Sequence, residues 1–308
     1  MPDQPVADAG EPWRRLTERV VASFDASPSP RYREVMQSLV RHLHDFATDV
    51  RLTEAEWAAG VDVLTRSGQL SDARRQELIL LSDVLGLSML TIGLNAPADP
   101  GVTASTVFGP FFVQGSPHVE QGGDLAGGAP GQPCWVQATV RGPGGSPVVG
   151  ARVEVWEADE DGLYDTQYDG ERVAGRGHLF TDEAGAVRFW SVRPSPYPIP
   201  ADGPVGELLV AAGRGPMRPA HIHFMISAAG HRTLTTHVFA AGDPHLADDA
   251  VFGVVASLVT PFTEHPAPSF RPDTTPDTAP DAVPPGGPPD GPWSSVRFDF
   301  VLAPEGSP

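Results

Sequence analysis

The sequence predicts a mostly β protein in which an α-helical N-terminal domain precedes a β-sandwich domain. Two observations predict this fold class. Residues 14 to about 94 repeat apolar side chains at helical spacing. After the stretch NAPADPG the chain becomes rich in Gly and Pro and carries short β-rich runs separated by turn residues. We therefore expect a helical domain over residues 1–98 and a β-sandwich domain over residues 99–308.

Three helices are predicted in the first domain. RYREVMQSLVRHLHDFATDV has helical apolar spacing, and TEAEWAAGVDVLTRSG opens with a capping box from Thr53 to Glu56. A third, strongly apolar helix is expected from about Ser71 to Gly93. Its leucines are typical of a core or a subunit contact.

Seven runs have the length and partial alternation of sandwich strands. They are CWVQATV, ARVEVWEA, AVRFW, ELLVAA, HIHFMI, TLTTHVFA and VRFDFVL. HLFTDEAGAVRFW is interpreted as a hairpin. The segment 264–293 is too rich in proline to enter a sheet, so we expect a long surface loop before the last strand.

Charge and composition exclude several classes of function. The formal charge of -18 disfavours nucleic acid and anionic membranes as partners. The chain has no lysine, which excludes Schiff-base chemistry, and its single cysteine, Cys134, excludes an internal disulfide or a Cys-rich metal site. The start, MPDQPVADAGEPW, lacks a signal-peptide pattern, and the run Leu78–Leu94 is too short and polar to span a bilayer. We expect a cytoplasmic protein that is not membrane-embedded.

The stretch RPAHIHF contains a candidate metal-ligand pair. In a strand, His221 and His223 point to the same face and can address one ion. An HxH pair alone is weak evidence for a metal, because most such pairs are surface or packing histidines. A zinc or Fe(II) enzyme would add another histidine or a carboxylate, for which Asp243 and His245 are available.

Two of the four tyrosines offer another way to complete the site. Tyr164 lies in the acidic run EADEDGLYDTQ, and Tyr197 is enclosed by prolines in RPSPYPIP. Either ring can simply pack a loop. As phenolates, however, the two would be hard anionic donors, and together with two imidazoles they would favour Fe(III) over Fe(II).

At this point the sequence resembles the intradiol ring-cleaving dioxygenases, which open an aromatic ring between two adjacent hydroxyls with non-haem Fe(III). The resemblance runs from GARVEVWEADEDGLYDTQ through the tyrosine in its proline cage to RPAHIHFMISAAGHRTLTTHVF. It implies one Fe(III) per subunit, with four ligands: Tyr164, Tyr197, His221 and His223. It also implies that Tyr197 leaves the iron when the substrate binds, and that Arg218 stabilises negative charge developing on the ring.

One position departs from the catechol-cleaving pattern. His237, in TTHVF, stands where those relatives have glutamine, and together with DAVFGV and TVFGPFF this resembles the hydroxyquinol (1,2,4-trihydroxybenzene) branch. The apolar run LILLSDVLGLS resembles the family's helix over the active site. Asp83 there is either capped or ion-paired, or it accepts a hydrogen bond from a third substrate hydroxyl. The implied substrate contacts are Leu80, Asp83, Val107, Phe108, Gly109, Pro110, Phe111, Ile199, Pro200, His237 and Phe252.

The function implied by the resemblance is cleavage of hydroxyquinol with O2 to 3-hydroxy-cis,cis-muconate, the tautomer of maleylacetate. Catechol or a chlorocatechol is the alternative substrate. A non-enzymatic β-sandwich binding module is the alternative of another class, because GARVEVWEADEDG also suits such domains. The resemblance further implies a homodimer formed through the helical domain, with a phospholipid bound at the dimer interface.

Overall fold

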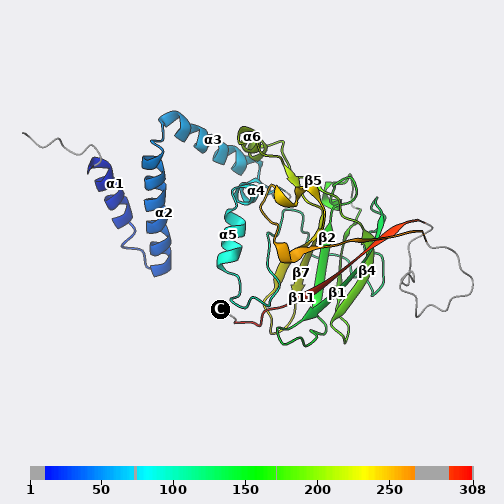
Figure 1. Cartoon of the computed structure of the whole chain (residues 1–308). Coiled ribbons are helices and arrows are strands. Elements are labelled where there is room, and N and C mark those ends of the chain that lie inside the picture. Colours follow the sequence, from blue (N-terminus) through cyan, green and yellow to red (C-terminus); the bar gives the residue numbers. More distant parts are fainter. Residues whose placement is uncertain (1–10, 73–74, 171, 268–290, 307–308) are drawn as a thin grey trace, which may run out of the picture. The chain divides into compact units, whose positions relative to one another are not determined.

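The computed structural model describes residues 11–72, 75–170, 172–267 and 291–306. The chain divides into two compact units, Met1–Thr65 and Arg66–Pro308 (Figure 1). The residues predicted to carry chemistry all belong to the second unit. The predicted domain boundary at residue 98 stays a prediction, because the compact units divide the chain by packing and not by function.

The first unit contains α1 (Glu11–Ala22), α2 (Pro30–Asp49) and the start of α3 (Glu54–Leu70). The predicted capping box is confirmed at α3. Glu56 Oε2 accepts a hydrogen bond from the Thr53 amide at 2.9 Å, and the Glu56 amide donates to Thr53 Oγ1 at 3.2 Å. The reciprocal pair satisfies two amides that the first turn of a helix leaves without partners.

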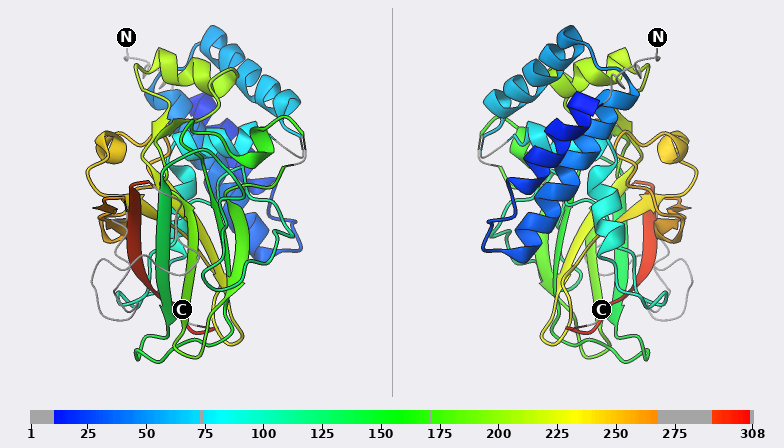
Figure 2. Two further views of the ribbon diagram at one scale, coloured as in Figure 1. Left: turned by 90° about the vertical axis from the view of Figure 1, so that its right-hand side faces the viewer. Right: turned by 90° about the vertical axis from the view of Figure 1, so that its left-hand side faces the viewer.

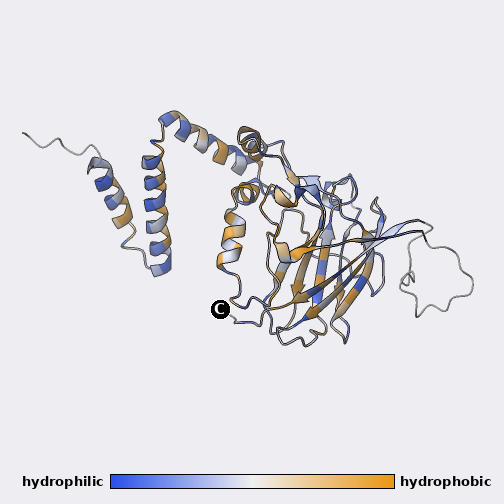
Figure 3. Cartoon of the chain, in the orientation of Figure 1, coloured by the Kyte–Doolittle hydropathy of each residue, from blue (hydrophilic) through white to orange (hydrophobic). Residues whose placement is uncertain are grey.

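The single helix predicted from Ser71 to Gly93 is wrong. The segment forms α4 (Glu77–Val84) and α5 (Leu87–Leu94), which are separated at Gly86. Gly86 has φ of 72°, a left-handed conformation that ends a helix and that glycine adopts without a Cβ penalty. α4 is largely buried, whereas no residue of α5 is buried, although α5 is strongly hydrophobic (Figure 3).

No single helix among the described residues has both the length and the apolar character needed to cross a membrane; only α4 and α5 taken together do, and they meet at a bend of 76°.

The second unit contains two sheets that pack face to face, as predicted for a sandwich. One sheet has the order β10-β11-β1-β4 and the other β3-β2-β7-β8-β9. Their strands run in similar directions in both views of Figure 2. The strands are β1 (Pro133–Arg141), β2 (Arg152–Glu157), β3 (Arg176–Phe180), β4 (Ala186–Val192), β7 (His221–Ser227), β8 (Leu234–Ala240), β9 (Val259–Thr260), β10 (Thr263–His265) and β11 (Trp293–Val301).

A short ribbon lies outside both sheets and brings two distant segments together. It pairs β5 (Tyr197–Pro198) with β6 (Met217–Arg218), so that Tyr197 lies directly opposite Arg218. β6 leads through Pro219 and Ala220 straight into β7. The ribbon therefore places the tyrosine of the proline cage beside the first residues of RPAHIHF.

Two predicted strand elements need correction. ELLVAA belongs to a helix, α6 (Pro204–Ala211), and not to a strand. Pro204 in the first turn and Gly213 just beyond the end are the sequence signals of that helix. The predicted hairpin contains a tight turn, but its two arms enter different sheets: β3 pairs with β2, and β4 pairs with β1.

The predicted loop 264–293 begins and ends inside strands. Residues 264 and 265 belong to β10, and residue 293 opens β11. Both ends pair with each other, His265 opposite Trp293, so the segment leaves and re-enters the same sheet edge. The part 268–290 lies outside the described residues.

The register of β7 determines which of its side chains reach the site. Ile222, Phe224 and Ile226 enter the main hydrophobic core between the sheets. His221 and His223 alternate with them and therefore point to the opposite face of the sheet. That face is also buried, since His221 and His223 are each only 1% exposed. A strand buried on both sides thus carries an apolar face and a polar face.

Candidate metal centre

His221 and His223 are brought together with the two predicted tyrosines. His223 Nε2 lies 3.0 Å from the Tyr164 hydroxyl and 3.1 Å from His221 Nε2. The Tyr197 hydroxyl lies 3.1 Å from that of Tyr164 and 3.5 Å from His221 Nε2. We call these four residues the donor cluster. All four side chains are buried.

Local structure fixes both tyrosines. In the acidic turn, Asp159 Oδ1 accepts hydrogen bonds from the amides of Asp161 and Leu163, each at 2.9 Å. Directly after the turn, Gln167 Oε1 accepts from the Tyr164 amide at 3.0 Å. Tyr197 is held by the β5–β6 ribbon. The two phenols thus come from rigid segments, as a ligand set requires.

The separations of the donor atoms fit a single metal ion. First-row transition metals bind imidazole nitrogen and oxygen donors at about 2.0–2.2 Å. Two donors at that distance and at 90–110° to each other lie roughly 2.8–3.6 Å apart, by simple geometry from those bond lengths. The four measured distances run from 3.0 to 3.5 Å. Two oxygen and two nitrogen donors therefore surround one point.

Protonation is consistent with this arrangement. Burial lowers the pKa of His221 well below its ordinary value, and the charge of Arg218 lowers it further. The pKa of His223 is also lowered well below its ordinary value, mainly by burial and further by His221 and the charge of Arg218. Both imidazoles are therefore neutral, the form that binds metals. Burial and the neighbouring Tyr197 raise the pKa of Tyr164 well above its ordinary value, so a phenolate there needs a nearby cation.

Arg218 lies at the edge of the donor cluster and is itself buried. Its Nη1 is 3.1 Å from His221 Nε2 and 3.4 Å from the Tyr197 hydroxyl, and its Nε donates to Asp249 Oδ1 at 3.2 Å. Burial alone would lower the pKa of the guanidinium, but Tyr197 and Asp249 outweigh it and raise the pKa above its ordinary value. A permanent positive charge thus faces the position of the metal.

Buried polar atoms without a hydrogen-bond partner among the described residues gather at this site. They include Arg218 Nη2, His223 Nδ1, His237 Nε2 and Trp156 Nε1. Each such atom costs about 1–3 kcal/mol when left without a partner. A concentration of them in one place is typical of a functional site.

His237 lies next to the donor cluster. Its ring is 4.1 Å from that of His223 and 4.6 Å from that of His221, centre to centre, and the Thr106 hydroxyl holds its Nδ1. Within the described residues, the three histidines also form a group whose nitrogens could share an ion. His237 is therefore positioned either to meet a bound substrate or to contribute to the metal site.

Several predicted substrate contacts pack directly on the donor cluster. The ring of Phe111 stacks on Tyr164 at 4.3 Å. Phe108 contacts Trp156, which in turn stacks on His223 at 4.7 Å. The backbone at Gly109 is so close to His223 that a side chain there would come within 3.1 Å of its ring. The segment TVFGPFF, with Pro110 between these residues, thus covers one side of the metal site.

A second group lies beside Arg218 and forms what we call the substrate wall. It consists of α4 with Leu80 and Asp83, the loop 249–253, Val107 and Ile199. Leu80, Val107 and Ile199 share one hydrophobic cluster with Ala250 and Val251 of the loop. Pro200 follows Ile199 and is half-buried.

The buried carboxyl of Asp83 stands out within this apolar wall. Burial raises its pKa above the ordinary value, while a hydrogen bond from Ser88 and the charge of Arg218 oppose that shift. Asp83 thus has a partner of its own, and it also lies near enough to Arg218 to interact with its charge. Both interpretations of Asp83 made from the sequence remain open.

Phe252 is the predicted contact that lies most exposed, at 53%. Its φ of 55° is unusual for a bulky residue. The ring packs near Gly86, and the guanidinium of Arg214 lies 4.5 Å from its centre.

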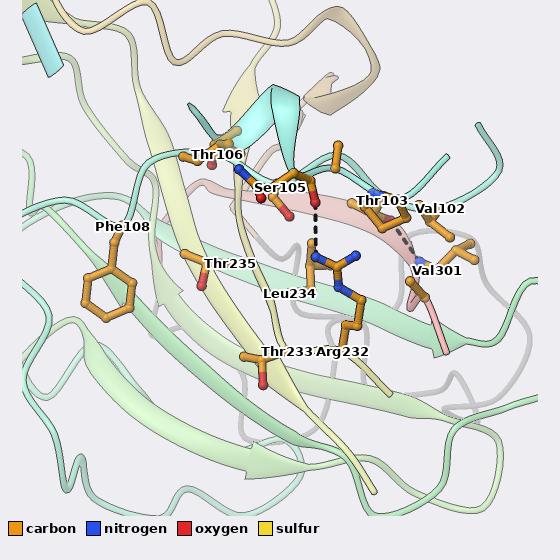
Figure 4. A pocket seen from close by; sticks show the side chains of 15 residues that line it. Val102, Thr103, Ser105, Thr106, Phe108, Arg232, Thr233, Leu234, Thr235 and Val301 are labelled. Atoms are coloured by element: carbon orange, nitrogen blue, oxygen red, sulfur yellow. Dashed lines mark hydrogen bonds between the residues drawn. The ribbon is translucent and has the colours of Figure 1, made fainter. Parts of the chain in front are cut away.

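A separate pocket of about 340 Å³ lies where the segment 102–108 passes β8 (Figure 4). Thr106 and Phe108 line it together with Thr233, Leu234 and Thr235, but none of the four residues of the donor cluster does. The pocket is therefore distinct from the metal centre, although Thr106 touches both through His237.

The alternative metal site, in which Asp243 or His245 joins His221 and His223, is wrong. His245 lies in a 3-10 turn, Pro244–Ala247, where it pairs with Asp248 at 3.2 Å. Asp243 accepts hydrogen bonds from the amides of Ala220 and His245, so its carboxylate is committed to the backbone. Neither belongs to the histidine group at the site.

Three functional neighbours were not identified from the sequence. Asp249 orients Arg218, Trp156 stacks on His223, and Thr106 holds His237. Asp249 and Trp156 lie in the quoted runs DAVFGV and ARVEVWEA, but only the tertiary structure reveals their partners. A sheet register brings Trp156 opposite His223 and His223 opposite His237.

The β-sandwich brings two phenols and two imidazoles together in a candidate site for one metal ion. Residues 107–304 match the family model "Dioxygenase", and residues 29–103 match "Catechol dioxygenase N terminus".

Similar proteins agree with these matches. The chain is 56% identical to hydroxyquinol 1,2-dioxygenase of Nocardioides simplex over 94% of each chain. It is 55% identical to 6-chlorohydroxyquinol 1,2-dioxygenase of Cupriavidus pinatubonensis, over 84% of this chain and 94% of that protein. The crystal structure of hydroxyquinol 1,2-dioxygenase from Pseudomonas putida DLL-E4 superposes with a TM-score of 0.85 at 42% identity, covering 96% of this chain and 99% of that one.

The chain therefore belongs to the intradiol ring-cleavage dioxygenases and is an enzyme of that family. The resemblance found in the sequence and the predicted fold class are both confirmed. The family depends on non-haem iron, and the site offers buried histidines for a metal.

Proposed function

We propose that the protein cleaves hydroxyquinol between its two adjacent hydroxyls, with O2, to 3-hydroxy-cis,cis-muconate or its tautomer maleylacetate. The observation that carries the proposal is the donor cluster, in which two phenols and two imidazoles lie 3.0–3.5 Å apart beside a buried arginine. The identity of 54–56% to hydroxyquinol dioxygenases supports the substrate. Both oxygen atoms of O2 end in the product.

Tyr164, Tyr197, His221 and His223 would hold one Fe(III) per subunit. When bound, ferric iron would accept both adjacent hydroxyl oxygens of the substrate as ligands and would draw electron density from the ring, which would prepare a ring carbon for attack by O2. The two neutral imidazoles leave the net charge of the centre to the phenolates and the substrate. The trivalent ion supplies the cation that the buried Tyr164 phenolate needs.

Tyr197 is the protein group best placed to take up a substrate proton. Its hydroxyl lies at the edge of the donor cluster, with Arg218 Nη1 at 3.4 Å. As the substrate hydroxyl binds, its proton would pass to the Tyr197 oxygen, and the resulting neutral phenol would no longer serve as an anionic ligand. The ribbon of β5 and β6 holds the Tyr197 ring beside the donor cluster.

Arg218 then stabilises negative charge on the substrate. Its guanidinium remains protonated, and Asp249 holds it from the far side. A fixed positive charge in a site without bulk water stabilises a developing anion strongly. The apolar side chains of TVFGPFF and of the substrate wall exclude water from the same place.

The third hydroxyl of hydroxyquinol distinguishes it from catechol. Asp83 and His237 are two buried polar groups near the site that can meet it. A site that hydrogen-bonds a substrate hydroxyl discriminates strongly against the analogue without it. Chlorinated hydroxyquinols, catechol and chlorocatechols are the competing substrates.

Oxygen uptake by the purified iron-loaded protein tests the proposal. Rates are measured with hydroxyquinol, 6-chlorohydroxyquinol, catechol, a chlorocatechol and protocatechuate, each corrected for uptake without enzyme. We expect the highest kcat/KM with hydroxyquinol, and a red-brown colour from phenolate-to-iron charge transfer. Faster turnover of catechol would overturn the substrate, and a colourless protein at full iron occupancy would overturn the donor cluster.

We also propose a homodimer, a bound phospholipid and a cytoplasmic location. A homodimer formed through the helices, a phospholipid at its interface and a cytoplasmic location rest on the family resemblance and on composition. α2 and its C-cap residue Val50 carry an apolar stripe that suits such a contact: Tyr32, Val35, Leu39, Leu43, Phe46 and Val50, each at least 44% exposed. Sedimentation of the purified protein and mass spectrometry of its organic extract would test the dimer and the lipid separately.

A further inference from the structure

Arg214 joins three segments that are far apart in the sequence. Its Nη1 donates to the carbonyl of Val84 at 2.6 Å, and its Nη2 donates to the carbonyl of Ala250 at 2.8 Å. The same guanidinium lies 4.5 Å from the ring centre of Phe252. Val84 is the last residue of α4, and Ala250 and Phe252 belong to the loop 249–253. One side chain therefore links both halves of the substrate wall.

The end of α6 determines where Arg214 lies. Gly213 has φ of 66°, its amide donates to the carbonyl of Val210 at 3.1 Å, and the Arg214 amide donates to that of Leu209 at 2.9 Å. This pair of hydrogen bonds is the Schellman ending of a helix. α6 itself packs on α4, since Val205 and Leu209 share a hydrophobic cluster with Leu80, Leu81 and Val84. The arginine thus projects from a rigid base.

The bidentate geometry is specific to arginine. A planar guanidinium can donate to two carbonyls in fixed directions and still lie against an aromatic ring, whereas a lysine ammonium is a single point charge on a flexible stem. Val84 O is among the last carbonyls of α4, which lack partners inside the helix. Arg214 therefore both satisfies the end of α4 and holds the loop against it.

The held loop has an uncommon conformation. Phe252 has φ of 55°, and its ring lies beside Gly86, where an added Cβ would be 3.6 Å from it. A bulky residue keeps such a backbone only where its surroundings impose it, and sites of this kind cluster around ligands. Arg214 on one side and Gly86 on the other confine the ring.

Arg218 is held independently of Arg214. Asp249 accepts from Arg218 Nε at 3.2 Å and from the Gly253 amide at 2.9 Å, and the Ala250 amide donates to the carbonyl of Met217 at 3.0 Å. These bonds tie the base of the loop to β6. Loss of Arg214 should therefore loosen the link between α4 and Phe252, which then depends on the apolar packing of α4 against Ala250 and Val251, while leaving Arg218 and the donor cluster in place.

We propose that Arg214 is a positioning residue for substrate selection, which sets the separation between α4, with Leu80 and Asp83, and the Phe252 loop. The inference rests on the proposed function, because it assigns these two segments to the wall that meets the third hydroxyl of the substrate. Arg214 touches no reacting atom. It acts through the Val84 and Ala250 carbonyls and through the Phe252 ring.

The test compares wild type, Arg214→Met and Arg214→Lys, with Arg188→Met as the control. Met keeps the aliphatic length without the charge or the donors, and Lys keeps the charge without the fork. Arg188 pairs with Asp182 at 3.1 Å on the surface and touches neither segment. For each protein kcat and KM are measured with hydroxyquinol and catechol, alongside iron content and the visible spectrum.

We expect Arg214→Met to raise KM for hydroxyquinol about tenfold while kcat changes less than about threefold, because ground-state contacts weaken and the metal chemistry stays intact. In the same variant, the ratio of kcat/KM for hydroxyquinol to that for catechol should fall about tenfold. The ratio for Arg214→Lys should lie between those of Arg214→Met and wild type. The ratio for Arg188→Met should equal that of wild type. Iron content and colour should not change. An equal loss with both substrates, or an unchanged preference, would overturn the proposal.

A second variant covers the case in which Arg214→Met does not fold. Phe252→Leu removes the aromatic face that Arg214 lies against and leaves both hydrogen bonds to the carbonyls intact. Phe252→Leu should lower the preference for hydroxyquinol over catechol about threefold, which is less than the effect of removing the Arg214 side chain. An unchanged preference would count against the proposal. Failure of the proposed function would look different, since wild type itself would then not turn over hydroxyquinol.

Discussion

The donor cluster and the substrate wall lie side by side at Arg218 but are built in opposite ways. The donor cluster depends on sheet register and rigid turns, and each of its donor atoms lies 3.0–3.5 Å from two others. The substrate wall joins a helix, a loop and isolated apolar residues, and its polar links run through side chains such as Arg214 and Asp249. A metal tolerates little displacement of its ligands, whereas selectivity between similar diols changes with each individual contact to the substrate. The two regions should therefore respond differently to substitution.

The largest effect is expected from removing a donor. Tyr164→Phe keeps the ring that Phe111 stacks on and deletes only the hydroxyl that lies 3.0 Å from His223 Nε2. Activity should fall by about a thousandfold or more with every diol, because both metal affinity and the anionic charge of the site are lost. Measurement of the iron content and of the visible absorption band would show whether the activity is lost together with the metal and the phenolate ligand.

Tyr168→Phe is the matched control for this change. Tyr168 lies four residues further along, and its hydroxyl bonds Asp159 outside the donor cluster. It should retain iron, colour and most activity. If Tyr164→Phe kept the colour and turned over any diol near the wild-type rate, the donor cluster would not be the metal centre.

The next effect concerns stability and comes from a buried acid under the donor cluster. Burial raises the pKa of Glu157 to about 8, a hydrogen bond from Ser191 opposing the shift. In the unfolded chain a glutamate titrates near 4.3. Between about pH 4.3 and 8 the folded protein holds a proton that the unfolded chain has released. The free energy of unfolding should therefore fall as pH rises through this range, by at most about 1.4 kcal/mol per unit.

Glu157→Gln tests this contribution. The variant cannot ionise at this position, so its stability relative to wild type should increase steadily from pH 5 to pH 8. Urea unfolding at four pH values measures the difference. Parallel curves for the two proteins would show that Glu157 is already ionised in the folded state. Unlike Tyr164→Phe, this change should leave iron binding near pH 6 intact.

The difference between the donor cluster and the substrate wall also explains which parts of the site could be predicted from the sequence. The members of the donor cluster could be predicted because an HxH pair on a strand and two tyrosines in restrictive contexts are local patterns, and because together they resemble the pattern of a known family. The sandwich followed from the short β-rich runs. The predictions failed where tertiary contacts decide. ELLVAA has strand-like apolar residues but folds as α6, and the two arms of the expected hairpin enter different sheets.

The substrate wall shows why the rest could not be predicted. Gly86 lies within a long apolar run that gives no sign of a helix end. Its left-handed backbone nevertheless separates α4 from α5, and the ring of Phe252 packs beside it. Arg214 has no motif at all, since its partners are main-chain carbonyls 130 and 36 residues away. Local spacing carries no information about contacts of that kind.

A smaller effect is expected where a turn touches the donor cluster. Gly162 has φ of 77°, and a Cβ there would lie 2.7 Å from that of Tyr197. Gly162→Ala must therefore displace Tyr197 or the turn that carries Tyr164. We expect activity to fall about 10- to 100-fold with all diols, with partial loss of iron.

Gly150→Ala separates this contact from backbone strain. Gly150 has φ of 69° but nothing within 4 Å of an added Cβ. It should lose about 1–2 kcal/mol of stability, the cost of a left-handed alanine, and keep its iron and activity. Equal losses of activity in the two variants would mean that strain alone accounts for Gly162.

The smallest effect should appear in the substrate wall, and only with one substrate. Asp83→Asn keeps the size of the side chain and removes the carboxylate, which is 3% exposed within an otherwise apolar segment. If Asp83 accepts a hydrogen bond from the third hydroxyl of hydroxyquinol, kcat/KM for that substrate should fall about tenfold, the value of one such bond. Catechol has no hydroxyl at that position, so its kcat/KM should stay within about twofold and serves as the internal control. Should both substrates lose equally, Asp83 would be a structural partner of Ser88, and the preference for the triol would have to come from His237.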